Sequence, residues 1–230
     1  MRTYRAELLR SVNRATGAFL LLCIALTVFS MVNAGPQHNT PLWGFRQAAI
    51  FVATLLMGRA ATVTAGDFST GTIRSWLISA PSRGPVLLGK LAATMSVALG
   101  FALVAGLSAY AVSSALGTVP AVTEVATATA QLGFACATLT LFGHSIGVLA
   151  RSVPVALTIT LAWILPVEAV LDGRFHNSEQ WLPGLVAHQI TLGQLAPGST
   201  PPTALAHAML PFLVLEIAAL AQFIRSDINS

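Results

Sequence analysis

Six long apolar runs constrain this chain more than any other feature of its sequence. A helix needs about 20 apolar residues to cross the hydrocarbon layer of a bilayer, and each run has about that length or more. A soluble protein of this size could not bury so much apolar surface, since 55% of the 230 residues are hydrophobic and only 9% are charged. We therefore predict an all-α integral membrane protein whose single domain has six transmembrane helices, at residues 15–34, 47–65, 85–116, 122–150, 153–171 and 203–224.

A further apolar segment, residues 181–197, is short for a span and contains Pro183-Gly184, Gly193 and Pro197. Backbone that is interrupted in this way is tolerated at membrane depth only where protein covers it or water reaches it. We expect a re-entrant hairpin of two short helical pieces within an outer loop at residues 172–202. The alternatives are a flexible outer loop and a seventh span, which would place the C-terminus outside the cell.

The distribution of Lys and Arg predicts the orientation, because cytoplasmic loops carry an excess of these residues. With the N-terminus inside, nine of the 12 fall on the cytoplasmic side, two fall outside, and Arg59 lies within the second span. The nine are Arg2, Arg5, Arg10, Arg14, Arg74, Arg83, Lys90, Arg151 and Arg225, and the two are Arg46 and Arg174. We therefore predict a multi-pass protein of the plasma membrane with both termini in the cytoplasm.

Residues 2–14 are expected to form a helix that lies on the inner membrane surface. Its apolar face would carry Tyr4, Leu8, Leu9 and Val12, and its polar face Glu7, Arg10 and Arg14, although Arg5 falls on the apolar face. A disordered basic leader is the alternative. The next apolar run ends in Val32-Asn33-Ala34, which is similar to a signal-peptide cleavage site. The run is longer than a signal core, so we expect a retained span.

The longest cytoplasmic connection, residues 66–84, contains several signals for a short helix. Asp67, Ser69, Thr70 and Thr72 can cap a helix N-terminus, and Pro81 would end the helix. Between them, Ile73, Trp76 and Leu77 are spaced i, i+3 and i+4 and form one apolar face. Such a face outside the membrane either docks onto another protein or lies back on the bilayer interface, and the spacing alone does not choose between them.

Three short stretches around this connection resemble the permease subunits of the type-2 ABC exporter family. They are Asp67-x-x-x-Gly71-Thr72, Ser79-Ala80-Pro81-Ser82-Arg83 and Leu87-Leu88-Gly89-Lys90. That family usually has Glu where this chain has Asp67. In residue detail the resemblance covers residues 67–90. The resemblance also extends to the layout of the whole chain, which has an interfacial helix, six spans and a broken outer segment before the last span.

The resemblance implies a transport subunit that acts with two copies of an ATP-binding subunit and with a second permease, either another copy of this chain or a close homologue. The partner would bind ATP and Mg²⁺, and this chain would move an amphipathic or hydrophobic substrate, such as a drug, antibiotic, peptide or lipid, out of the cell. The face of Ile73, Trp76 and Leu77 would dock on the ATP-binding subunit as a coupling helix, with Arg74 and Arg83 pairing with acidic residues there. The implied coupling residues are Asp67, Gly71, Thr72, Ile73, Arg74, Trp76, Leu77, Pro81, Arg83 and Lys90.

The sequence has no convincing pattern for nucleotide binding or catalysis. Residues 84–91 nearly match a phosphate-binding loop, but Leu91 stands where that loop needs a hydroxyl, and Pro85 removes a backbone donor. Cys23 and Cys136 lie in different apolar runs and match no metal or redox spacing, which is typical of packing residues. The basic residues form no stripe for nucleic acid. We expect a membrane-embedded subunit that is not an enzyme and holds no cofactor of its own.

Four polar side chains fall at membrane depth, where ionisable groups are costly and mark candidate functional sites. They are Arg59, His144, Glu168 and Glu216. We consider an Arg59–Glu216 pair across the bundle, ordinary interfacial solvation of Glu168, and a packing role for His144 within the small-xxx-small stretch at residues 143–147. A proton relay through His144 would suit the alternative function, an ion-coupled transporter or channel that works without ATP.

Overall fold

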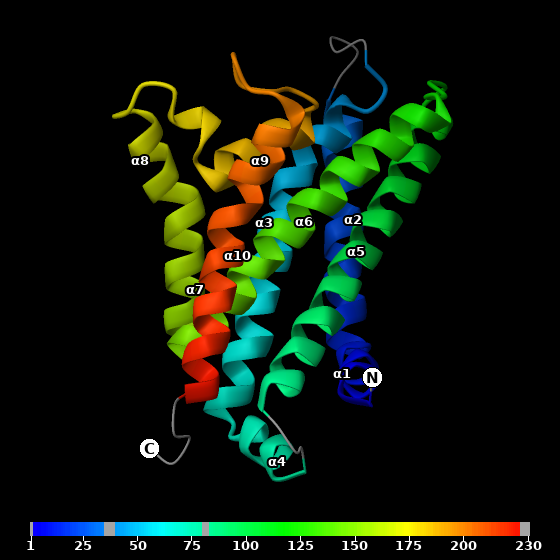
Figure 1. The fold of residues 1–230 in the computed structure, drawn as a ribbon. Coiled ribbons are helices and arrows are strands. Elements are labelled where there is room, and N and C mark those ends of the chain that lie inside the picture. The colour runs from blue at the N-terminus through cyan, green and yellow to red at the C-terminus, as the bar shows by residue number, and fades with distance from the viewer. Residues whose placement is uncertain (1, 35–39, 80–82, 226–230) are drawn as a thin grey trace.

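The fold is known from a computed structural model that describes residues 2–34, 40–79 and 83–225, apart from the side chains of Arg2, Arg74, Leu77 and Ser79. Within these ranges every regular element is a helix (Figure 1). The elements are α1 (Arg2–Ser11), α2 (Arg14–Asn33), α3 (Trp43–Ser69), α4 (Thr72–Ser79), α5 (Arg83–Ala115), α6 (Val122–Ala150), α7 (Val153–Ala162), a π-turn (Trp163–Val167), α8 (Glu168–Asp172), a 3₁₀ turn (Ser178–Gln180), α9 (Pro183–Leu192) and α10 (Pro201–Arg225).

The described residues contain six helices that are long and apolar enough to cross a membrane. The sequence-based prediction of an all-helical membrane protein with six spans is therefore confirmed at this level. Five candidate spans are single helices, and the fifth in chain order combines α7, the π-turn and α8. Pro166 lies inside the π-turn, where the missing N–H of proline and the wider turn interrupt the helix without ending it.

The six spans run up and down between two ends of the bundle, which we call the α4 end and the α9 end (Figure 1). α1, α4 and the last residues of α10 lie at the α4 end, whereas α9 lies at the opposite end. α3 is longer than expected at both of its ends, so Arg46 and Asp67 both belong to the helix rather than to connections.

The centre of the bundle is the contact between α3 and α6. Two glycines of α6 allow this close approach: a Cβ built on Gly143 would lie 2.2 Å from the backbone oxygen of Met57, and one on Gly147 would lie 2.8 Å from the Cβ of Thr64. Small residues are favoured where membrane helices approach, because van der Waals packing rather than water exclusion holds them together. The predicted packing role of residues 143–147 agrees with this contact.

Two expectations about helix ends need correction. The N-terminal helix ends at Ser11 rather than at residue 14, because Asn13 caps α2 by accepting a hydrogen bond from the backbone N–H of Thr16 (2.9 Å). Residues 181–197 contain one helix, α9, rather than two helical pieces. α9 has 10 residues, a length of about 15 Å, which is half of what a span requires. It is therefore too short to form a seventh span.

We expect Gly143→Ala to destabilise the bundle by about 1–3 kcal/mol, since the added methyl group must push α3 and α6 apart. Gly100→Ala is the matched control, because no atom lies within 4 Å of the position its Cβ would take. That control is expected to be neutral or to stabilise by up to about 1 kcal/mol, as alanine favours a helix over glycine. Unfolding in mixed micelles by sodium dodecyl sulfate titration measures both, and equal effects would contradict the close contact.

Candidate functional site

A sharp turn separates α3 from α4 and directs α4 away from the end of the bundle (Figure 1). The turn is made by Gly71, whose φ of 71° lies in the left-handed region that glycine adopts at little cost. Thr70 closes α3 with a hydrogen bond from its N–H to the carbonyl of Gly66 (2.9 Å). The hydroxyls of Thr70 and Thr72 then lie 2.8 Å apart across the glycine. The predicted short helix after Gly71 is therefore present in the structure.

One side of α4 faces the bundle. Ile73 is only 5% exposed and packs in a small apolar cluster with Leu87, Val148, Ala219 and Phe223. The expectation that Ile73 enters a groove on a partner is therefore wrong for this conformation, because its own chain already covers it. Among the side chains of α4 that the structure describes, the exposed apolar one is Ile78, at 89%, a position that the i, i+3, i+4 pattern did not include.

Trp76, the second residue of the predicted docking face, is half-buried. The guanidinium carbon of Arg10 lies 6.0 Å from the centre of its ring, which is at the outer limit of a cation–π contact. The side chains of Arg74 and Leu77, and the whole of Pro81, lie outside what the structure describes. Arg83 opens α5 and is half-buried.

Four charged side chains meet at the base of α4, and we call them the charge cluster: Glu7, Arg10, Asp67 and Lys90. Arg10 lies 2.7 Å from one Asp67 oxygen and 3.5 Å from Glu7, while Lys90 contacts the other Asp67 oxygen and lies 3.8 Å from Glu7. Glu7, Asp67 and Lys90 are all buried. The hydrogen bond to Asp67 raises the pKa of Arg10 above its ordinary value, against a smaller opposing effect of burial.

The charge cluster joins three helices. Glu7 and Arg10 belong to α1, Asp67 to the last turn of α3, and Lys90 to the start of α5. Two acids and two bases neutralise one another, which offsets the cost of removing each charge from water. Asp67 and Lys90 are among the coupling residues that the resemblance implies, but nothing in the sequence indicates that Glu7 and Arg10 would complete the charge cluster.

A second polar site lies inside the bundle between α6 and α10. His144 is fully buried, and its Nδ1 lies 3.1 Å from each carboxylate oxygen of Glu216. The hydroxyl of Ser145 lies 2.7 Å from the same carboxylate. The other ring nitrogen of His144, Nε2, has no hydrogen-bond partner among the described residues. The expected Arg59–Glu216 pair is therefore wrong: Glu216 pairs with His144, and Arg59 instead contacts Ser11 and Thr16.

Glu168 is 1% exposed, so the expectation of ordinary interfacial solvation is also wrong. Its carboxylate accepts hydrogen bonds from the backbone N–H groups of Gly184 (2.9 Å) and Leu185 (2.8 Å) and from the indole of Trp163 (2.9 Å). Gly184 and Leu185 lie in the first turn of α9, where backbone donors lack partners and partial positive charge accumulates. Glu168 therefore caps α9 from another span.

The opposite end of α9 is held by Arg46 of α3. The Arg46 guanidinium donates to the carbonyl oxygen of Thr191 (3.3 Å) and to the side-chain oxygen of Gln131 (2.6 Å). A cation at the C-terminus of a helix complements its dipole, just as an anion does at the N-terminus. α9 is thus fixed at both ends by charged side chains from two different spans.

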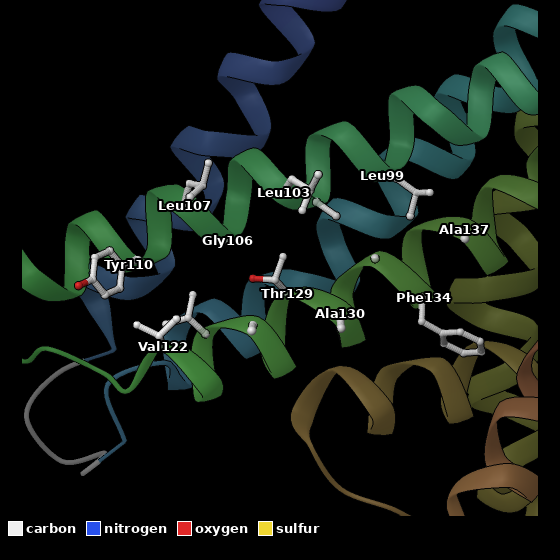
Figure 2. A pocket seen from close by; sticks show the side chains of 14 residues that line it. Leu99, Leu103, Gly106, Leu107, Tyr110, Val122, Thr129, Ala130, Phe134 and Ala137 are labelled. Carbon is white, nitrogen blue, oxygen red and sulfur yellow. The ribbon is translucent and has the colours of Figure 1, made fainter.

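A groove with a cavity volume of about 930 Å³ runs between α5 and α6. Figure 2 shows its wall along α5, with Leu99, Leu103 and Leu107, and the α6 side, with Thr129, Ala130 and Phe134. The lining is almost entirely apolar, and the hydroxyls of Thr129 and Tyr110 are among its few polar atoms. Such a surface suits an acyl chain or the apolar part of a larger molecule.

The structure supplies no described group of three or more His, Cys, Asp or Glu side chains that would hold a metal ion. Cys23 and Cys136 are both buried and free of disulfide bonds. Comparison of the sequence with protein-family models and with curated proteins finds no match.

The His144–Glu216 contact predicts an asymmetry between single and double replacements. His144→Leu should destabilise the protein by about 3–5 kcal/mol, because it leaves the Glu216 carboxyl buried without its main partner. The double variant His144→Leu/Glu216→Leu should recover most of this loss. Unfolding in mixed micelles gives the comparison, and a double variant as unstable as the sum of the two single variants would contradict the pairing.

The capping role of Glu168 predicts local opening of α9 in Glu168→Gln. The amide replaces one accepting oxygen by a donor and loses the charge that complements the helix, at a cost of about 1–3 kcal/mol. Hydrogen exchange at Gly184 and Leu185 should accelerate by about tenfold or more. Glu124→Gln, at an exposed position of α6, is the control. Unchanged exchange in α9 would show that Glu168 is not its cap.

Proposed function

We propose that this chain is the membrane-spanning subunit of an ATP-driven exporter, similar to the permeases of the type-2 ABC exporter family. The observation that carries the proposal is α4, a short helix held outside the bundle between two candidate spans, with Ile78 89% exposed at its far side. An exposed apolar side chain on a short projecting helix is available to enter a groove on another protein, as in helix-in-groove recognition. In this proposal α4 is the coupling helix, and the α4 end faces the cytoplasm.

The connections of α4 support a mechanical role. Gly71 links it to α3, Ile73 anchors it among residues of α5, α6 and α10, and the charge cluster ties α1, α3 and α5 together beneath it. A displacement of α4 by a partner would therefore move several helices at once rather than bend a loop. When ATP brings two partner subunits together, the paired permease copies would be driven between conformations in this way.

The cargo in this proposal is amphipathic or hydrophobic. The α5–α6 groove has the apolar lining that such a molecule requires (Figure 2). It lies along the second half of α5 and the first half of α6. The clamped helix α9 would cover the outer end of the transport route. ATP and Mg²⁺ would be bound by the partner subunit, because this chain has no hydroxyl at Leu91 to complete a nucleotide loop.

A second candidate function is ion-coupled transport without ATP, and the His144–Glu216 contact favours it. Carboxylates and histidines inside a membrane bundle often mark ion or proton pathways, and here they are in contact, with no described partner at the Nε2 of His144. The two functions differ in a simple observation: an exporter of the first kind has a P-loop ATPase encoded beside it, and a proton-coupled transporter needs none.

Ile78→Asp should abolish docking of the ATP-binding subunit, since it places a charge where α4 exposes an apolar side chain. We expect the amount of P-loop ATPase that co-purifies with the chain from its own host to fall about tenfold or more, as for loss of an interface hot spot. Ile78→Leu is the matched control, because it keeps the apolar volume and should retain the partner.

Membrane insertion and unfolding temperature should be unchanged in both variants, because Ile78 makes little contact with its own chain. Normal capture of the ATPase by Ile78→Asp would refute the coupling role of α4. Absence of any P-loop ATPase from the wild-type preparation, together with proton-driven uptake by the purified chain, would favour the second function.

A further inference from the structure

A polar cavity of about 280 Å³ lies at the α4 end between α1, the start of α2 and the inner half of α3. Arg59 projects into this region from α3, and Asn13, Arg10 and Thr62 are among the other residues that line it. The cavity is distinct from the α5–α6 groove and plays no part in the proposed docking of α4. We propose that it binds a phosphate group, supplied by the headgroup of a phospholipid in the adjoining leaflet.

The first argument is the unsatisfied guanidinium of Arg59. Its Nη2 lies 3.0 Å from the hydroxyl of Thr16 and 3.4 Å from the carbonyl of Ser11. Nη1 and Nε have no acceptor among the residues that the structure describes, so three of the five N–H donors of the guanidinium remain free. Each of these donors can give a charge-assisted hydrogen bond to an oxygen of a phosphate group.

The second argument is charge. Glu7 and Asp67 also line the cavity, but both already pair with Arg10 and Lys90 in the charge cluster. Two acids and two bases cancel, and Arg59 forms no ion pair with a described acidic side chain. A lone cation at the border of the hydrocarbon layer is costly, so a bound anion would stabilise it. The backbone donors at the N-terminus of α2 add a further partial positive charge on the same side.

The third argument identifies a lipid rather than a free ion as the source. The apolar run of α2 begins at Ala15, two residues after the Asn13 that lines the cavity, so the cavity lies where polar headgroups meet hydrocarbon. Leu9 of α1 and Val12, which follows α1, are each 70% exposed. Exposed leucine and valine beside a cationic cavity match the two parts of a phospholipid, with acyl chains against the apolar side chains and the phosphate against Arg59.

The test uses the full chain, purified in a neutral detergent and stripped of lipid. Native mass spectrometry measures binding of phosphatidylglycerol, of diacylglycerol with the same acyl chains but no phosphate, and of inorganic phosphate alone. We expect phosphatidylglycerol to bind and diacylglycerol not to bind. Arg59→Gln should weaken phosphatidylglycerol binding by about 10- to 100-fold, in keeping with the loss of a charged hydrogen-bond pair. Arg174→Gln, which removes an exposed arginine at the other end, should bind as the wild type does.

Arg59→Lys keeps the positive charge but replaces the separate Nη1 and Nε donors with one ammonium group. It should therefore bind phosphatidylglycerol with intermediate affinity, and it shows whether the loss in Arg59→Gln comes from misfolding. Equal binding of phosphatidylglycerol and diacylglycerol, or equal binding by the wild type and both Arg59 variants, would overturn the proposal. Binding of inorganic phosphate that depends on Arg59, without binding of phosphatidylglycerol, would overturn the lipid source and assign the cavity to a free anion. None of these outcomes depends on an ATPase partner, so failure here leaves the proposed function untouched.

Discussion

Charged side chains that leave water must be neutralised by their neighbours, and the arrangement of helices in this protein depends on where that happens. Apolar contacts alone specify little inside a bilayer, because the lipid is as apolar as the helix surfaces. The polar contacts here each join two different helices, and the partners lie from 16 to 72 positions apart in the chain. Asp67 and Lys90 join α3 to α5, His144 and Glu216 join α6 to α10, and Glu168 joins α8 to α9. The close α3–α6 contact supplies the centre around which these links are arranged.

Much of the fold could be predicted from the sequence, since span length and apolar content are properties of continuous segments. The same holds for Gly71 and for the short helix after it, whose signals are local. The partner of Glu216 could not be predicted in this way. The pairing depends on which face of α6 meets α10, and α6 is similarly apolar on all its faces, so its sequence has no strong periodicity that would indicate the contact.

The apolar face of α4 shows where local reasoning stops. The i, i+3, i+4 spacing places Ile73 on an apolar face. Whether that face turns toward the bundle depends on the residues that Ile73 packs against, such as Leu87 and Phe223. Phe223 lies 150 positions further along the chain, so local spacing could not reveal this contact. Ile78 was missed because it falls outside the pattern.

One signal for Glu168 was available. α9 begins with Pro183 after Leu182, which has no capping side chain, so the backbone N–H groups at its start needed an acceptor from elsewhere.

The two clamps on α9 have a geometric consequence for any motion of the bundle. A ten-residue helix is a stiff rod of about 15 Å, and its ends are attached to Glu168 in one span and to Arg46 in another. The distance between those two attachment points can therefore neither grow nor shrink by more than side-chain rearrangement permits while both contacts persist. If the spans separate at this end, one contact must break before the other. Helix α9 would then pivot about the contact that remains. Because the weaker contact breaks first, α9 would move with the span that provides the stronger one.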